Sequence, residues 1–152
     1  MVTPAPQPGL PARTIRIPAE SSQLAEVRAF VRAAGADLGA SAAVTADLVQ
    51  AVDEAVSNII VHGYAGASGE VEIEAGAADG KIEIRVLDRS RPFDPTAAPP
   101  PDVSSPPRHR KPGGMGIHLL RAGTDEVHHR SRDDGGNELR LVRALHDAAR
   151  ED

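Results

Sequence analysis

Five short strands are expected along the chain, and alternating apolar and polar residues mark the first three of them. In the second strand, Val71 and Ile73 alternate with glutamates, so one face of the sheet would be covered by helices and the other exposed to solvent. Between the second and third strands, Asp79-Gly80 is a strong hairpin signal. The expected strands span residues 13–17, 70–75, 81–88, about 125–130 and 137–144.

Two other segments carry apolar residues at spacings of three and four, which is typical of amphipathic helices. The first helix is expected to begin at a cap on Ser21 or Ser22 and to stop at Gly35. The second is expected to run from Ser41 to about residue 62, ended by Gly63. Its apolar face would comprise Val44, Leu48, Val52, Ala55, Val56 and Ile59.

A long proline-rich stretch separates the third strand from the end of the chain. Residues 89–112 contain eight prolines and almost nothing able to form a core. A structureless loop of this length in a compact domain is usually a functional lid or a linker. We therefore expect one domain at 13–145 with a mobile lid at about 89–116, between a disordered tail at 1–12 and a second tail at 146–152.

These elements predict an α/β fold, a two-layer sandwich whose mixed, mostly antiparallel sheet carries helices on one face. The aromatic residues are Phe30, Tyr64 and Phe93, so the core must consist of valine, isoleucine, leucine and alanine. Such a core is thin, and a partner chain or a ligand would add stability.

Charge and composition exclude several classes of function. The formal net charge is −5 at pH 7, whereas a general nucleic-acid binder would show a basic excess. The absence of cysteine excludes a disulfide framework or a thiolate metal site, and the six histidines show no metal-ligand spacing. Without a long apolar run or a signal-type N-terminus, we expect a cytoplasmic protein with no membrane segment.

A carboxylate and an amide lie one turn apart on the second helix. Glu54 and Asn58 are four residues apart, so they share the shoulder of its apolar face. There they could hold a hydrated Mg²⁺, which prefers oxygen ligands, and activate a nucleophile. The alternative is the ordinary polar flank of an amphipathic helix, and taken alone the pair favours that alternative.

The third strand ends in an acidic residue. Counting by twos from Ile82 through Ile84 and Val86 places Asp88 on the buried face. A carboxylate buried there needs donors, such as backbone amides or a ligand amine. The alternative is that the strand ends one residue earlier and Asp88 begins a solvated turn; the pattern does not decide between the two.

A glycine cluster precedes the short helix that we expect through Ile117 and Leu120. Closely spaced glycines at residues 113, 114 and 116 let the backbone approach phosphates, and the first turn of a helix offers free N–H groups to an anion. The alternative is a flexible turn. Neither a GxxxxGK[ST] loop nor a GxGxxG motif after a strand is present, which disfavours Walker and Rossmann binding.

The order and spacing of these three elements resemble those of the GHKL ATPases, which have the Bergerat ATP-binding fold. Residues 54–64 are similar to the N-box of that superfamily, in the form found in bacterial anti-sigma factor serine kinases. Residues 86–95 resemble the motif in which an aspartate receives the adenine amine, and residues 113–120 resemble the glycine-rich lid motif. The resemblance covers roughly residues 13–143.

The resemblance implies a site for ATP and Mg²⁺. Asn58 would bind Mg²⁺ and through it the phosphates, Glu54 would act as general base, and Asp88 would hold adenine. The remaining positions that the resemblance assigns to the nucleotide are Ser90, Phe93, Gly114, Met115 and Gly116.

Two residues depart from the family pattern, and both belong to the part of the site that would surround the adenine base. Ser90 stands where the family usually has glycine, and a positive φ there would cost about 1 kcal/mol or more. Glu138 stands where many relatives have a threonine, and its charge would repel Asp88 if the two approach closely. We therefore expect the adenine contacts, rather than the phosphate contacts, to be altered.

The function implied by the resemblance is a protein serine kinase that also binds a sigma factor. Such kinases transfer the γ-phosphoryl group of ATP to a serine of a small antagonist protein with a STAS fold, and the related proteins often form homodimers. The alternative is a binding module of the same fold that sequesters a regulator, with nucleotide binding weak or merely structural.

Overall fold

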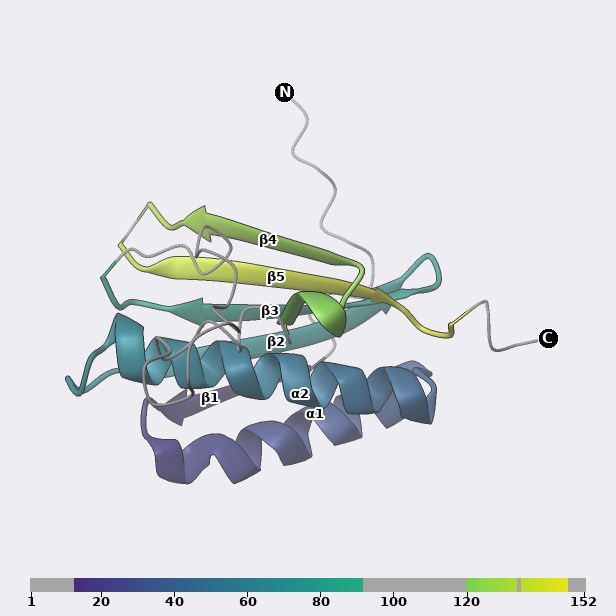
Figure 1. Ribbon diagram of the computed structural model, residues 1–152, viewed down its shortest axis with the longest axis horizontal. Coiled ribbons are helices and arrows are strands. Elements are labelled where there is room, and N and C mark those ends of the chain that lie inside the picture. The colour runs from purple at the N-terminus through teal and green to yellow at the C-terminus, as the bar shows by residue number, and fades with distance from the viewer. Residues whose placement is uncertain (1–12, 92–119, 134, 148–152) are drawn as a thin grey trace, which may run out of the picture.

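Five strands and two long helices make up the part of the chain that the computed structural model describes, which is residues 13–91, 120–133 and 135–147 (Figure 1). In chain order the elements are β1 (Arg13–Pro18), a 3₁₀ turn (Ser21–Gln23), α1 (Leu24–Leu38), α2 (Ala42–Asn58), a π turn (Ile59–Gly63), β2 (Glu70–Ala78), β3 (Lys81–Asp88), β4 (Glu126–Ser131) and β5 (Asn137–Ala144). The five expected strands are thus confirmed.

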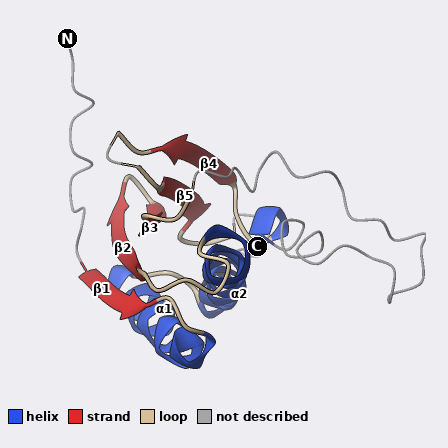
Figure 2. Cartoon of the chain, turned by 90° about the vertical axis from the view of Figure 1, so that its left-hand side faces the viewer, coloured by secondary structure: helices blue, strands red, loops and turns tan. Residues whose placement is uncertain are grey.

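The strands form a single sheet in the order β1-β2-β3-β5-β4, and α1 and α2 cover one of its faces (Figure 2). The α/β fold with helices on one face is therefore confirmed. Each of the four pairings between these strands is antiparallel, so among the described strands the sheet is not mixed. The hairpin between β2 and β3 turns at Asp79 and Gly80, with φ values of 54° and 77°, as the sequence predicts.

The core lies between the helices and the sheet and is entirely aliphatic among the described residues. Val31, Leu48 and Val52 from the helices meet Ile73 and Ile84 from the sheet, all of them fully buried. Phe30 and Tyr64 pack only at the edge of this cluster. No described helix combines the length and the apolar character that crossing a bilayer requires.

The expected stop of the first helix at Gly35 is wrong. The helix continues to Leu38 and ends at Gly39, whose φ of 91° gives a left-handed C-cap. Gly35 serves close packing instead, because a Cβ there would lie 2.5 Å from the Oγ1 of Thr45 on α2. The two glycines have different physical roles that spacing alone does not separate.

The two helix starts differ in how well the sequence predicts them. Ser41 caps α2, with its hydroxyl accepting from the Val44 N–H at 3.1 Å, as expected. The expected cap on Ser21 or Ser22 is wrong, because both residues lie in the 3₁₀ turn and the N-cap of α1 is Gln23. Beyond Asn58 the second helix continues as a π turn to Gly63, near the predicted end.

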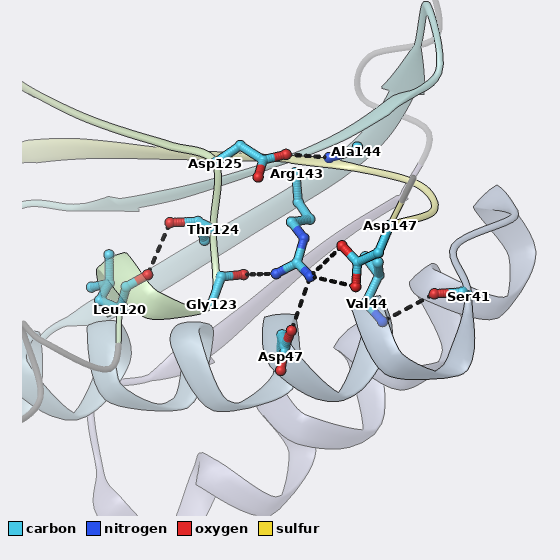
Figure 3. Close-up of polar contacts among 10 residues, drawn as sticks. All are labelled: Ser41, Val44, Asp47, Leu120, Gly123, Thr124, Asp125, Arg143, Ala144 and Asp147. Atoms are coloured by element: carbon cyan, nitrogen blue, oxygen red, sulfur yellow. Dashed lines mark hydrogen bonds and ion pairs between the residues drawn. The ribbon is translucent and has the colours of Figure 1, made fainter. Parts of the chain in front are cut away.

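Arg143 joins the end of β5 to three other segments (Figure 3). Its guanidinium donates to the carbonyl of Gly123 at 2.7 Å and pairs with Asp47 of α2 at 3.0 Å and with Asp147 at 2.9 Å. Arg143 is only 7% exposed. Burial lowers the pKa of Arg143, but the hydrogen bonds to Asp147 and Asp47 outweigh it, and the pKa lies above its ordinary value. Asp147, which we assign to the C-terminal tail from the sequence, therefore contacts the domain.

Replacing Arg143 should destabilise the fold. Arg143→Met removes the cation between two carboxylates and leaves the Gly123 carbonyl without this donor, so we expect a loss of about 2–3 kcal/mol in the free energy of unfolding. The matched control is Arg16→Met on β1, where the exposed guanidinium lies 3.7 Å from Glu72 and the pair should contribute about 1 kcal/mol or less. Urea denaturation measures both, and equal losses would contradict this assignment.

Candidate functional site

Asp88 lies at the end of β3 on the face that the helices cover. It is 2% exposed, it stands opposite Val71 of β2 and Asn137 of β5, and β3 runs through it. The prediction from counting by twos is confirmed, and the alternative of a solvated turn is wrong. A carboxylate in this position has to be satisfied by donors from the protein or from a ligand.

The two oxygens of the Asp88 carboxylate have different surroundings. Oδ1 accepts from the backbone N–H of Ser90 at 2.8 Å, from its hydroxyl at 2.6 Å and from Nδ2 of Asn137 at 3.1 Å. Oδ2 is buried and has no hydrogen-bond partner in the described part of the chain. A buried acceptor left open in this way is suited to a donor from a ligand or a water molecule.

Ser90 does not have the positive φ that would strain a serine. Among the described residues, positive φ outside glycine occurs at Ala65 and Asp79. Ser90 is 4% exposed and folds back onto Asp88 through both its N–H and its hydroxyl. A serine at this position therefore adds a donor to the carboxylate instead of straining the backbone.

Glu138 does not approach Asp88, so the repulsion that a close approach would cause does not arise: the two side chains lie on opposite faces of the sheet. Glu138 stands opposite Leu87 and pairs with Arg130 of β4 at 3.0 Å. The residue that faces Asp88 is Asn137, which sequence reasoning missed. Counting back by twos along β5 from its buried leucines would have placed Asn137 on the helix-covered face.

Asn58, the last residue of α2, lies across a narrow cavity from Asp88. It is 7% exposed, and its Nδ2 is buried without a hydrogen-bond partner among the described residues. The cavity is lined by Ala55, Asn58, Ile59, Asp88, His129, Asn137 and Leu139. Its volume is about 10 Å³, which is room for about one water molecule. The cavity therefore marks where the two motif residues converge rather than the space of a whole ligand.

Glu54 lies one turn before Asn58 on α2 and is half-buried. Burial, and then the negative charge of neighbouring Asp53, raise the pKa of Glu54 above its ordinary value. Asp53 itself turns toward α1, where Arg28 binds it at 2.8 Å. The structure thus separates the two adjacent acids: one is paired with an arginine of α1, and the other carries a raised pKa.

Tyr64 ties the end of the second helix to the segment that follows Asp88. Its hydroxyl donates to the carbonyl of Glu70 at 2.7 Å and accepts from the N–H of Arg89 at 2.9 Å. Gly69 lets the ring approach, because a Cβ there would lie 2.1 Å from the ring. Tyr64 therefore fixes the chain on both sides of the site. In residues 89–91 of the predicted lid, Ser90 is also held by Asp88, and Arg91 donates to the carbonyl of His62 at 3.4 Å.

The rest of the predicted lid lies outside the described residues, and so do four predicted nucleotide contacts: Phe93, Gly114, Met115 and Gly116. In the described part of the chain, no group of three or more His, Asp or Glu side chains could hold a metal ion by itself. The amide oxygen of Asn58 nevertheless is a donor of the kind that Mg²⁺ takes together with phosphates and water, so this residue fits such an ion.

Comparison with known proteins decides the family. The model of the histidine kinase-like ATPase domain matches residues 17–143. The chain belongs to this family. The resemblance of its motifs to the GHKL ATPases is thereby confirmed.

Named relatives include the serine-protein kinase RsbW of Bacillus cereus (strain AH820) and of Bacillus anthracis (strain A0248). Each is 28% identical over 117 residues, which make up 74% of this chain and 73% of the relative. The crystal structure of the RsbU and RsbW domains of Rv1364c from Mycobacterium tuberculosis matches with a TM-score of 0.57 and 23% identity. That match covers 87% of this chain and 32% of the longer one, and it shows a common fold.

The turn between β4 and β5 gives a test of how tightly Asp88 is held. Gly135 and Gly136 both have positive φ, 87° and 99°, but only at Gly136 would a Cβ collide with the protein, 2.1 Å from the carbonyl oxygen of Asp88. Gly135→Ala should cost about 1 kcal/mol from backbone strain. Gly136→Ala should cost at least about 3 kcal/mol and displace Asp88. Denaturant unfolding compares the two, and equal costs would refute the close contact.

Proposed function

We propose that this protein is an ATP-dependent protein serine kinase that also acts as an anti-sigma regulatory factor. The observation that carries the proposal is the convergence of an open acceptor, Oδ2 of Asp88, and the buried amide of Asn58 on one cavity. Membership of the histidine kinase-like ATPase family and relatives named as serine-protein kinases support the same chemistry.

We assign the binding of the adenine base of ATP to Asp88. The exocyclic amine of adenine carries N–H donors, and Oδ2 of Asp88 is a buried acceptor that lacks one. Ser90 contributes indirectly, because its N–H and its hydroxyl both donate to Oδ1 of Asp88. Phe93 keeps its assignment to the nucleotide from the sequence motif.

The phosphates are assigned to the end of α2 and to the glycine motif. Asn58 would hold Mg²⁺ through its amide oxygen, and Gly114, Met115 and Gly116 would contribute backbone N–H groups. When bound, Mg²⁺ neutralises charge on the phosphates. Because phosphoryl transfer depends mainly on alignment and charge neutralisation, a small domain with few catalytic side chains is sufficient.

Glu54 is assigned as the general base. The serine hydroxyl oxygen of the substrate bonds to the γ-phosphorus, the bond from this phosphorus to the β–γ bridging oxygen breaks, ADP leaves with the electron pair, and Glu54 takes the hydroxyl proton. The reaction needs Glu54 deprotonated. Because burial and Asp53 raise the pKa of Glu54, the rate should begin to fall at a higher pH than for an ordinary glutamate as the solution is acidified.

The partners that we propose are a STAS-fold antagonist that supplies the serine and a sigma factor that the kinase sequesters. The acidic balance of the chain, −5 at pH 7, agrees with protein partners rather than nucleic acid. We further propose a cytoplasmic location and a homodimer, which would supplement the thin aliphatic core.

Glu54→Gln should abolish transfer without abolishing nucleotide binding. Loss of the base should lower the rate of phosphate transfer to a STAS-fold substrate by about 100-fold or more. ATP affinity should stay within about threefold, because Glu54 contacts only the reacting hydroxyl. Radiolabelled phosphate transfer and equilibrium binding measure the two effects. Glu26→Gln, the same change at an exposed position of α1, is the matched control and should leave both unchanged.

Two results would count against the proposal in different ways. Transfer by Glu54→Gln at the wild-type rate would remove Glu54 from the mechanism and leave the kinase in place. No transfer by the wild type, together with full partner binding by both forms, would overturn the kinase function and favour the sequestering module.

A further inference from the structure

Three side chains from neighbouring strands form a chain of hydrogen bonds that ends at Asp88. Nε2 of His129 on β4 lies 2.9 Å from Oδ1 of Asn137 on β5. Nδ2 of Asn137 lies 3.1 Å from Oδ1 of Asp88 and is also within reach of the Ser90 hydroxyl, at 3.3 Å, and of the Arg91 carbonyl, at 3.2 Å. The three side chains line the same narrow cavity as Asn58.

The polarity of this chain is set by what each atom can do. The carboxylate oxygen of Asp88 and the carbonyl of Arg91 accept, so the Asn137 amide must turn its NH₂ group toward them. Its carbonyl oxygen then faces His129, which must donate from Nε2. Turning the amide over would place an oxygen against the carboxylate and two N–H groups against a donating imidazole. As a donor at Nε2, His129 therefore supports the orientation that Asp88 and the Arg91 carbonyl impose, in which Asn137 donates to Asp88.

The outcome for Asp88 is a carboxylate with one occupied and one open oxygen. Oδ1 receives three donors, two from Ser90 and one from Asn137. Rotation of the carboxylate would break these bonds, so Oδ2 stays directed away from them. Oδ2 is buried with no partner among the described residues. A ligand group that brings a donor to Oδ2 is favoured, and one that lacks a donor leaves a buried acceptor unpaired.

We propose that Asn137, supported by His129, is a positioning residue that sets base selectivity by keeping Oδ2 of Asp88 as a rigid acceptor for an exocyclic amine. The inference rests on the proposed function, since it concerns the same nucleotide site. It adds that β4 and β5 determine how strongly a purine with an amine at the 6-position is preferred over one without it. Neither residue touches the reacting phosphate.

A matched pair of substitutions at Asn137 tests the inference. Threonine and valine have the same shape and both suit a strand, but only threonine retains a donor toward Asp88. The measurement is the ratio of the dissociation constants of the Mg²⁺ complexes of ATP and of purine riboside 5′-triphosphate, which lacks only the amine. Asn137→Val should reduce the preference for ATP by about tenfold, and Asn137→Thr should retain most of it. A merely structural role would weaken both nucleotides together and leave the ratio unchanged.

His129 supplies an independent pair of variants on the edge strand β4. Gln can place an amide donor near Nε2, whereas Met fills similar space without one. His129→Gln should keep the ratio, and His129→Met should lower it in the same direction as Asn137→Val. The double variant with Asn137→Val should show no further loss, because both changes act through the same amide. These variants decide the matter if Asn137→Val does not fold.

The outcomes separate this inference from the proposed function. A wild type that binds ATP with an Asp88-dependent preference, and an Asn137→Val variant that keeps that preference, would overturn the inference alone. A wild type that binds neither nucleotide would overturn the proposed function and the inference with it. Loss of the preference in Asn137→Val and His129→Met, with its retention in the conservative variants, is the supporting result.

Discussion

Burial of the Asp88 carboxylate constrains the whole end of the sheet where the candidate site lies. A carboxylate buried to 2% exposure requires donors, and the strand register supplies one by placing Asn137 opposite it on β5. Ser90 supplies two more by folding back onto the same oxygen. Gly136 completes the arrangement, because only a residue without a side chain can pack against the Asp88 carbonyl. The oxygen that these contacts leave open is the one that we assign to a ligand.

The second half of the site depends on how α2 ends. The π turn after Asn58 leads directly to Tyr64, whose hydroxyl binds the backbone at the start of β2 and just beyond Asp88. The helix that carries Asn58 and the strand that carries Asp88 are thereby held by hydrogen bonds in addition to the core. A fixed separation between the groups that we propose bind the adenine base and the phosphates is what phosphoryl transfer by alignment requires.

The sequence predicted the elements well where a periodic pattern was long, and less well where a single residue had to be interpreted. Alternation along β3 placed Asp88 on the buried face without deciding whether the strand reached it, and the sequence suggested Glu138 rather than Asn137 as its neighbour. That error is a shift of one residue, which exchanges the two faces of a strand. Gly35 was interpreted as a helix stop because spacing does not distinguish a close helix contact from a C-cap. Hydrogen-bond partners such as His129 depend on strand order, which no local pattern contains.

The measurement that most directly tests the central claim is the affinity for Mg²⁺-ATP of the wild type and of Asp88→Asn. The substitution keeps the shape of the side chain and replaces an acceptor by an NH₂ group, either at the open position or among the donors that hold Oδ1. If Asp88 accepts a hydrogen bond from the adenine amine, the affinity of the Asp88→Asn variant for Mg²⁺-ATP should be at least about tenfold weaker than that of the wild type. Circular dichroism should confirm that the variant is folded. Equal affinity of a folded Asp88→Asn variant would contradict the claim.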